Sequence, residues 1–327
     1  MKFQTIFFGA PGTGKSHEVK SLLRNYSESK IFRITIHPEY SYTDFIGQYL
    51  PVKDQNGDLS FEFKEGVFTE ALKEAYNDTN EEVFLILEEV SRGNVSEIFG
   101  DIFQLLDRDE HFESKYPIRS KNISQQIAHL NNDLIILPSN FNIIGTVNIN
   151  DQNVFPMDTA FKRRFEWKYV STKPATDNNG YRLSKLNNPR IILKGRNDNI
   201  DTNWQTLYTS LNLFITDKEN GLGKNEDKQL GQFFIEFNHN LIKNSYDSGP
   251  IKKNEALAQI NDILRNKLLL YLWQDIQANS IFDTELSLFD SSVKNFDMLY
   301  ENFGKEKVFS DAFINNFLIP NLEKYPY

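Results

Sequence analysis

The chain has 327 residues, of which 39% are hydrophobic and 25% are charged, a composition typical of a folded protein with one large or two ordinary domains. A formal net charge of −9 argues against an autonomous DNA-binding surface, and the absence of cysteine excludes disulfides and thiolate metal sites. The longest apolar stretch, Leu268–Trp273, is too short to cross a bilayer, and the N-terminus lacks a signal-peptide pattern, so we expect a cytoplasmic protein without membrane contact.

The first half of the chain alternates apolar runs with amphipathic stretches. We expect five strands, at Phe3–Phe8, Ile31–Ile36, Val83–Leu87, Phe141–Val147 and Phe165–Val170. We expect helices between them, at Lys15–Tyr26, Gly66–Asn77 and Asn94–Leu106, while the Asn56-Gly57 pair indicates a β-hairpin. This alternation predicts an α/β fold in which helices cover both faces of a parallel sheet, and it leaves the order of the strands open.

The second half of the chain begins with a polar stretch, from Ser171 to Ile200, which indicates a connection or a surface insertion. After it, helical patterns dominate, at Trp204–Thr216, Asn254–Gln277 and Lys307–Leu318. We therefore expect an α/β domain at 1–170, a connection at 171–200 and a smaller, mostly helical domain at 201–327.

A glycine-rich motif separates the first expected strand from the first helix. It matches G-x-x-x-x-G-K-[ST] and comprises Gly9, Ala10, Pro11, Gly12, Thr13, Gly14, Lys15 and Ser16. Its glycines let backbone N–H groups converge on phosphates at a helix N-terminus, Lys15 would reach the β- and γ-phosphates, and the Ser16 hydroxyl would bind Mg²⁺. The alternative is an ordinary glycine-rich turn, which the flanking strand and helix disfavour. The motif therefore predicts a nucleoside-triphosphate site.

Two carboxylates follow the apolar run at Val83–Leu87. Glu88 stands where a carboxylate that organises Mg²⁺ is expected, and Glu89 where a base that polarises the attacking water is expected. Two glutamates after a strand are more often a solvated strand end, and it is their place downstream of a P-loop that favours the catalytic interpretation.

Four sequence blocks together resemble the McrB family, the GTP-hydrolysing AAA+ subunits of modification-dependent restriction systems. They are IHPEYSYTDFIGQYLP (36–51), LILEEVSRGNVSEIFGDIFQLLD (85–107), LPSNFNIIGTVNIND (137–151) and MDTAFKRRFEW (157–167), with a weaker match at Glu226–Phe234. The resemblance implies an AAA+ P-loop NTPase, with a parallel sheet flanked by helices and a helical lid domain.

The resemblance also implies roles for single residues. Glu88 and Glu89 would be the Walker B acids, followed by Arg92 and Asn94 of an "NRxN" segment. Asn148 and Asp151 would position the lytic water. Arg163 and Arg164 would act in trans on the nucleotide of a neighbouring subunit, where an arginine stabilises charge on the transferring phosphoryl group.

The chain departs from the family pattern at several positions, with Glu88 in place of the commoner Asp and Ser91 in place of the usual Asn. Gln152 and Asn153 replace the usual Arg and Ser of the signature that contains Asn148, which puts in doubt any role that needs a charge there. The lid block, LGQFF (230–234), lacks a clear basic residue that would sense the γ-phosphate. Lys224 and Lys228 are the nearby candidates for this role. Because the first expected strand begins at Phe3, we expect no N-terminal DNA-reading domain in this chain.

Three functions are compatible with these features. The leading one is a ring-forming, Mg²⁺-dependent motor subunit that hydrolyses GTP rather than ATP, forms a homo-oligomer that is a hexamer, and is activated by an McrC-like nuclease; DNA would be contacted through the complex. The second is a MoxR-like ATPase that remodels proteins. It stays open because a P-loop binds the phosphates of ATP and GTP alike, and the segments that bind the nucleobase are not identifiable from the sequence. The third, a non-hydrolysing nucleotide-gated scaffold, is disfavoured because Glu89, Asn148 and both arginines are present.

Overall fold

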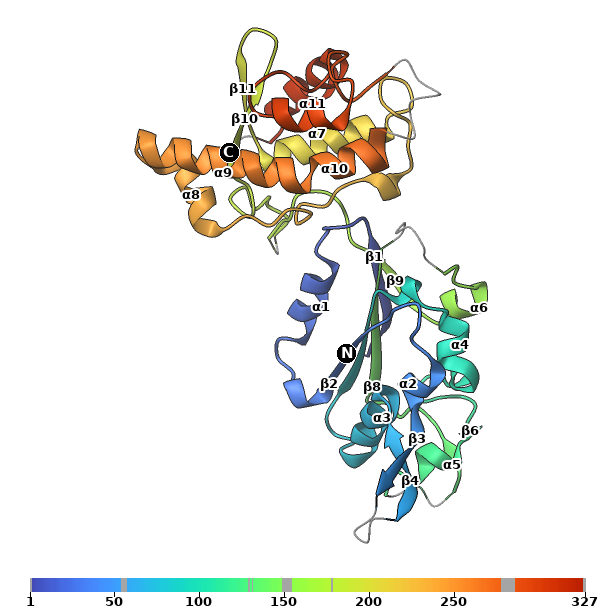
Figure 1. Ribbon diagram of the computed structural model, residues 1–327. Coiled ribbons are helices and arrows are strands. Elements are labelled where there is room, and N and C mark those ends of the chain that lie inside the picture. Colours follow the sequence, from blue (N-terminus) through green and yellow to red (C-terminus); the bar gives the residue numbers. More distant parts are fainter. Residues whose placement is uncertain are drawn as a thin grey trace. The chain divides into compact units, whose positions relative to one another are not determined.

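The structure is a computed structural model that describes residues 2–53, 58–128, 130, 132–148, 155–177, 179–277 and 286–325. By their contacts the residues form two compact units (Figure 1). The first unit comprises Met1–Phe8 and Lys15–Tyr169, and the second comprises Gly9–Gly14 and Val170–Tyr327. Each unit has its own hydrophobic core.

A five-stranded sheet forms the centre of the first unit, with the strand order β2-β5-β8-β1-β9. The strands are β1 (Gln4–Gly9), β2 (Ile31–Thr35), β5 (Val83–Glu88), β8 (Phe141–Asn148) and β9 (Glu166–Tyr169). Parallel registers join β2 to β5, β5 to β8 and β1 to β9, which confirms the predicted parallel sheet. The residues of β5 before Glu88 are fully buried because neighbouring strands and helices cover both faces, as the continuous apolar run predicts.

Helices flank this sheet, with α1 on one side and α4 on the other in Figure 1. The helices are α1 (Lys15–Leu23), α2 (Tyr42–Ile46), α3 (Val67–Asn77), α4 (Val95–Phe99), α5 (Lys121–Ser124) and α6 (Thr159–Lys162). The predicted helix Asn94–Leu106 differs, because α4 ends at Phe99 and a 3₁₀ helix follows at Gly100–Leu106. Gly100 adopts a φ of +48°, which interrupts the α-helical backbone where a residue with a side chain would be strained.

Two small antiparallel hairpins complete the first unit. One pairs β3 (Gly47–Lys53) with β4 (Leu59–Glu65), and the other pairs β6 (Ile118–Arg119) with β7 (Leu134–Ile135). The strands of the first hairpin lie where the sequence predicts a hairpin, while its Asn56-Gly57 turn lies outside the described residues.

The Arg108 side chain links several segments of the first unit from inside. Its guanidinium donates hydrogen bonds to the backbone carbonyls of Phe112, Leu137 and Phe141 and to the Gln4 side chain, at 2.8 to 3.0 Å. Burial lowers the pKa of Arg108, while the nearby carboxylates of Asp109 and Glu113 act in the opposite direction. One side chain thus donates to backbone carbonyls of several segments that are distant in sequence.

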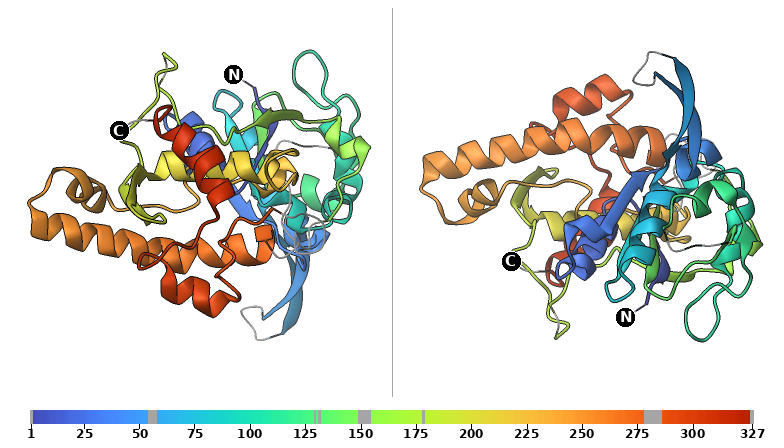
Figure 2. Two further views of the ribbon diagram at one scale, coloured as in Figure 1. Left: turned by 90° about the horizontal axis from the view of Figure 1, so that it is seen from above. Right: turned by 90° about the horizontal axis from the view of Figure 1, so that it is seen from below.

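Helices dominate the second unit, as the sequence predicts. Its elements are β10 (Arg190–Lys194), β11 (Asn199–Asn203), α7 (Trp204–Thr216), α8 (His239–Asp247), α9 (Pro250–Lys267), α10 (Leu269–Tyr271), α11 (Phe296–Asn302), α12 (Asp311–Phe313) and α13 (Ile319–Leu322). Figure 2 shows α9, in orange, as a long helix with α8 packed beside it. Turns of π-helix follow α10 at Leu272–Gln277 and α12 at Ile314–Leu318.

Element limits in the second unit differ from the sequence-based expectation at three points. The β10–β11 hairpin begins inside the polar stretch that indicates a connection. The helix expected from Asn254 begins at Pro250, because proline is well suited to the first helical turn. The helix expected from Lys307 begins at Asp311, because the Ser310 hydroxyl caps it by accepting the Phe313 N–H.

The α7 helix lies inside the second core and buries polar as well as apolar side chains. Its Asn203 cap accepts the Thr206 N–H at 2.9 Å. The Asn212 amide donates to the Leu230 carbonyl and accepts the Leu230 N–H, both at 2.7 Å. Asn321, near the C-terminus, donates to the hydroxyls of Thr209 and Ser210 at 2.8 and 3.0 Å. No helix in the described part of the chain is long and apolar enough to span a membrane.

Candidate nucleotide-hydrolysis site

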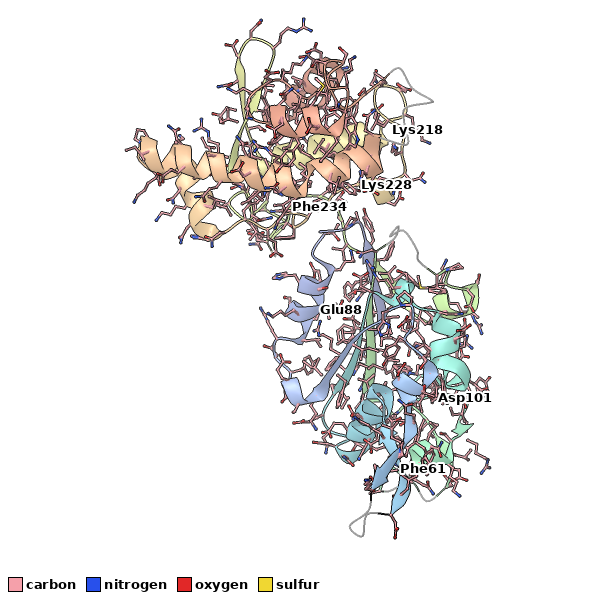
Figure 3. All side chains as sticks on the ribbon, in the orientation of Figure 1. Phe61, Glu88, Asp101, Lys218, Lys228 and Phe234 are labelled. Carbon is pink, nitrogen blue, oxygen red and sulfur yellow. The ribbon has the colours of Figure 1, made fainter. Side chains whose placement is uncertain are left out.

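The two predicted acids lie at the carboxyl end of β5, next to the end of β8. Because β5 and β8 are parallel neighbours, with Leu87 paired to Gly145, the residues that follow these positions meet at the same sheet edge. Figure 3 labels Glu88 at this edge. The sequence-predicted residues Glu88, Glu89 and Asn148 are therefore brought together in the first unit.

Both oxygens of the Glu88 carboxylate have donors. Its Oε2 atom accepts hydrogen bonds from the Thr146 hydroxyl and, at 3.3 Å, from the Ser16 hydroxyl. Its Oε1 atom accepts the Arg33 Nη1 atom at 2.6 Å. The Glu88 side chain is 14% exposed, so this carboxylate is largely enclosed by its partners.

Glu89 is held in an unusual backbone conformation, with φ 57° and ψ 43° in the left-handed region. This conformation is uncommon for a residue with a long side chain and costs about 1–2 kcal/mol. The Asn148 amide donates to both Glu89 oxygens at 3.0 Å, the Arg92 Nε atom donates to Oε2 at 3.2 Å, and the Glu89 N–H donates to the Thr146 hydroxyl at 3.3 Å. These contacts keep the carboxylate at the strand edge despite the strain.

Two members of this cluster, Thr146 and Arg33, are not among the site residues predicted from the sequence. Thr146 lies two residues before Asn148, and the two-residue repeat of a strand puts both side chains on one face, so the signal was present. Arg33 could be found only from the pairing of β2 with β5, which one sequence does not give.

The P-loop residues Gly9–Gly14 belong to the second unit by their contacts. Gly12 and Gly14 have φ values of +75° and +94°, which favour glycine. The Pro11 carbonyl accepts the Gly231 N–H at 2.9 Å, and the Gly12 carbonyl accepts the Phe233 N–H at 2.7 Å. The weak sequence match at Glu226–Phe234 thus includes the residues that support the P-loop backbone.

The side chains at this site fit a magnesium ion. The Ser16 hydroxyl and the Glu88 carboxylate provide oxygen atoms, and Mg²⁺ prefers one or two such ligands together with waters and substrate phosphates. No group of three or more His, Cys, Asp or Glu side chains with metal-site geometry occurs in the part of the chain that the structure describes.

The two predicted trans-acting arginines have different surroundings. Arg163 is exposed directly after α6. The Arg164 side chain is only 10% exposed, pairs with Asp107 at 2.6 Å, donates to the Ala160 carbonyl, and lies over the Phe103 ring. These contacts favour an internal role for Arg164, and its role in trans stays a prediction.

Other predicted residues lie elsewhere. Asp151, Gln152 and Asn153 fall outside the described residues. Lys224 and Lys228 belong to the second unit, where burial and, secondly, the charge of Lys228 lower the pKa of Lys224.

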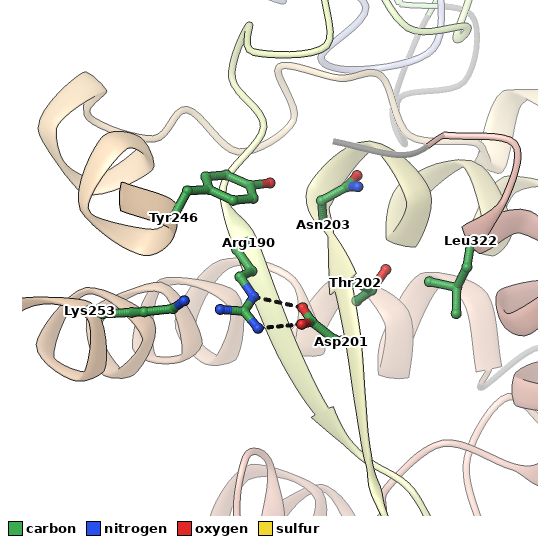
Figure 4. A pocket seen from close by; sticks show the side chains of 7 residues that line it. All are labelled: Arg190, Asp201, Thr202, Asn203, Tyr246, Lys253 and Leu322. Atoms are coloured by element: carbon green, nitrogen blue, oxygen red, sulfur yellow. Dashed lines mark hydrogen bonds and ion pairs between the residues drawn. The ribbon is translucent and has the colours of Figure 1, made fainter. Parts of the chain in front are cut away.

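A cavity of about 280 Å³ beside the β10–β11 hairpin contains none of the predicted site residues (Figure 4). Its main polar feature is a bidentate ion pair between Arg190 and Asp201, with Lys253 nearby. Arg190 and Asp201 neutralise each other, and the residues that line the cavity do not form a catalytic arrangement.

Comparison with known proteins agrees with this geometry. Residues 4–165 match the AAA domain of the dynein-related subfamily. The chain is 29% identical over 193 residues to the type IV methyl-directed restriction enzyme EcoKMcrB subunit of Escherichia coli K12, a match that covers 57% of this chain and 39% of that protein. It is 32% identical over 329 residues to the type II restriction enzyme BsuMI component YdiS of Bacillus subtilis, covering 89% of this chain and 85% of that protein. The chain belongs to the McrB-like AAA+ proteins of restriction systems.

These matches confirm the predicted resemblance to the McrB family and the predicted AAA+ fold. The chain is therefore a restriction-associated P-loop NTPase. A solved structure of a candidate ATPase from Cytophaga hutchinsonii matches 54% of this McrB-like chain and 43% of its own, with 17% identity and a TM-score of 0.33.

Proposed function

We propose that this McrB-like protein is a GTP-hydrolysing motor subunit that works as a ring, a hexamer, together with an McrC-like nuclease. The observation that carries the proposal is the cluster at the ends of β5 and β8, where Asn148 holds both oxygens of Glu89 and Thr146 contacts both acids. A nucleotide-binding scaffold that does not hydrolyse has no use for a strained carboxylate with this set of donors.

The residues divide the work between them. Lys15 and the N–H groups of Gly9–Gly14 would bind the phosphates, and Glu89 would accept the proton of the attacking water. Asn148 and Arg92 would fix the Glu89 carboxylate, and Asp151 would help to orient the water. Ser16 and Glu88 would hold Mg²⁺, which when bound neutralises charge on the phosphate oxygens.

Ring assembly would complete the site between subunits. An arginine from a neighbouring subunit can stabilise the transferring phosphoryl group and contributes a factor of roughly 10³ to 10⁵ in rate. Arg163 is the better candidate because its side chain is exposed, whereas Arg164 pairs with Asp107 in its own chain.

The partner and the nucleic acid follow from the same family. The relatives named above are components of restriction enzymes, so we infer an McrC-like nuclease as partner and DNA as the substrate of the whole complex. Since the chain carries a net charge of −9, we propose that DNA is contacted mainly through the assembly.

The test is phosphate release from GTP and from ATP, measured side by side over a range of protein concentrations. We expect faster release from GTP and a specific activity that rises with protein concentration, because subunits complete one another's sites. Glu89→Gln is the matched control: it should keep triphosphate affinity and lose at least about 100-fold in turnover.

Each part of the proposal can fail separately. Faster turnover of ATP than of GTP would refute guanine as the preferred nucleobase. A specific activity that does not change with protein concentration would refute the claim that assembly completes the site. Tight triphosphate binding without release from either nucleotide, at any concentration, would instead identify a scaffold.

A further inference from the structure

Arg33 lies on the edge strand β2 and reaches the carboxylate at the end of the neighbouring strand. Its backbone pairs with Ile86, and Thr35 pairs with Glu88, so Arg33 and Glu88 lie on the same face of the sheet, with one residue pair between them. The Arg33 Nη1 atom is 2.6 Å from Glu88 Oε1, a short charge-assisted contact. The Arg33 side chain is 42% exposed, whereas the Glu88 side chain is 14% exposed.

The cation of Arg33 shares a carboxylate that has a second task. On the proposed function, Glu88 and Ser16 organise Mg²⁺, and the Ser16 hydroxyl already contacts the Oε2 atom of Glu88. Thr146 also donates to Oε2, so Arg33 is the partner that occupies Oε1. A guanidinium and a divalent cation attract the same carboxylate and repel each other, so each weakens the hold of the other.

We propose that Arg33 is a positioning residue that balances the charge of Glu88 before the metal arrives and thereby raises the Mg²⁺ concentration at which the site fills. Filling the site weakens the Arg33–Glu88 ion pair, and the exposed guanidinium can then turn toward solvent. The inference rests on the proposed function, because it needs a triphosphate and Mg²⁺ at the P-loop.

The size of the effect follows from the exposure of the pair. Partly exposed ion pairs contribute little to an equilibrium, and the enclosed carboxylate places this pair toward the upper end of their range. Removing the positive charge should therefore lower the half-saturating Mg²⁺ concentration by about three- to fivefold.

The experiment measures equilibrium binding of a fluorescent, non-hydrolysable GTP analogue to the full chain as free Mg²⁺ is varied. Arg33→Gln should shift the Mg²⁺ dependence to lower concentration and leave the affinity in excess chelator unchanged. Arg33→Lys keeps the charge and should behave like the wild type. Arg196→Gln is the matched control, because Arg196 also forms a 2.6 Å ion pair, with Asp311, in the second unit.

The outcomes separate the two claims. A half-saturating Mg²⁺ concentration that is unchanged in Arg33→Gln, or raised, overturns the role of Arg33, and a rise would mean that the guanidinium orients Glu88 for the metal. If the wild type binds the analogue at no Mg²⁺ concentration, the proposed function fails and the role of Arg33 fails with it. If Arg33→Gln loses its circular dichroism spectrum, Arg33→Lys and Arg33→Met decide: the Mg²⁺ dependence must follow the charge of residue 33.

Discussion

Replacing Gly231 by alanine tests how the second unit supports the P-loop. A Cβ atom on Gly231 would lie 2.2 Å from the carbonyl carbon and oxygen of Gly12 and from the Thr13 nitrogen. Real Cβ contacts become ordinary only at 3.4 Å, so the two backbones must separate by about 1.2 Å. The atoms in the way belong to the backbone, which cannot swing aside as a flexible side chain can.

The cost follows from the hydrogen bonds at this contact. The Gly231 N–H reaches the Pro11 carbonyl at 2.9 Å and the Phe233 N–H reaches the Gly12 carbonyl at 2.7 Å, and a separation of about 1.2 Å breaks both. At about 0.5–1.5 kcal/mol each, their loss lowers the free energy of unfolding by about 1–3 kcal/mol. The P-loop also loses the contact that fixes its backbone, so triphosphate affinity should fall by about five- to 100-fold.

Urea unfolding measures the first effect and titration with a fluorescent triphosphate measures the second. Gly249→Ala is the control, since a Cβ there meets nothing within 4 Å. Alanine is less favourable than glycine at this N-cap position but lowers the entropy of the unfolded chain, so the two effects on stability oppose each other. The triphosphate affinity of Gly249→Ala should match that of the wild type. A Gly231→Ala protein that binds triphosphate within twofold of the wild type, with unchanged unfolding, would refute the described packing.

Three further predictions concern other parts of the chain. Mixing Glu89→Gln with Arg163→Ala, each inactive alone, should restore part of the hydrolysis, because some interfaces then combine an intact glutamate with an intact arginine; a dead mixture with assembly confirmed by light scattering excludes action in trans. Arg108→Met should lower the free energy of unfolding by about 2–5 kcal/mol in urea titrations, since it removes the guanidinium that donates to the backbone carbonyls of Phe112, Leu137 and Phe141, and Arg108→Lys should restore little of it. Hydrogen bonds from Lys307 and, secondly, from Ser292 lower the pKa of Asp290 to about 2, so these contacts stabilise the fold above about pH 4 and their contribution is lost as the pH falls toward 2; Asp290→Asn should flatten that part of the stability curve, and an unchanged curve would contradict it.

The sequence predicted those parts of the fold that depend on local pattern. The run of apolar residues at Val83–Leu87 predicted a central strand, and β5 lies there, with Glu88 as its last residue. The resemblance implies that Asn148 positions the lytic water, which stays a prediction, and in the structure its amide donates to both oxygens of Glu89.

The parts that were missed depend on contacts between distant segments. Arg33 meets Glu88 because β2 is next to β5, and strand order is decided by packing rather than by local propensity. Arg164 binds Asp107, which is 57 residues away, so a basic triplet alone could not show which arginine is engaged. The β10–β11 hairpin lies partly in a polar stretch because alternate residues of its strands are only half-buried or exposed.

The polar groups enclosed around α7 restrict how this region can evolve. Asn321 binds the hydroxyls of Thr209 and Ser210, and losing one side of such a buried contact costs about 1–3 kcal/mol, whereas replacing both sides together by apolar groups of the same shape is nearly neutral. Accepted substitutions at these positions should therefore come in pairs. An α7 segment transplanted from a relative should succeed only when the segment around Asn321 is transplanted with it. The α7 segment and the segment around Asn321, 111 residues apart, should therefore change together in evolution.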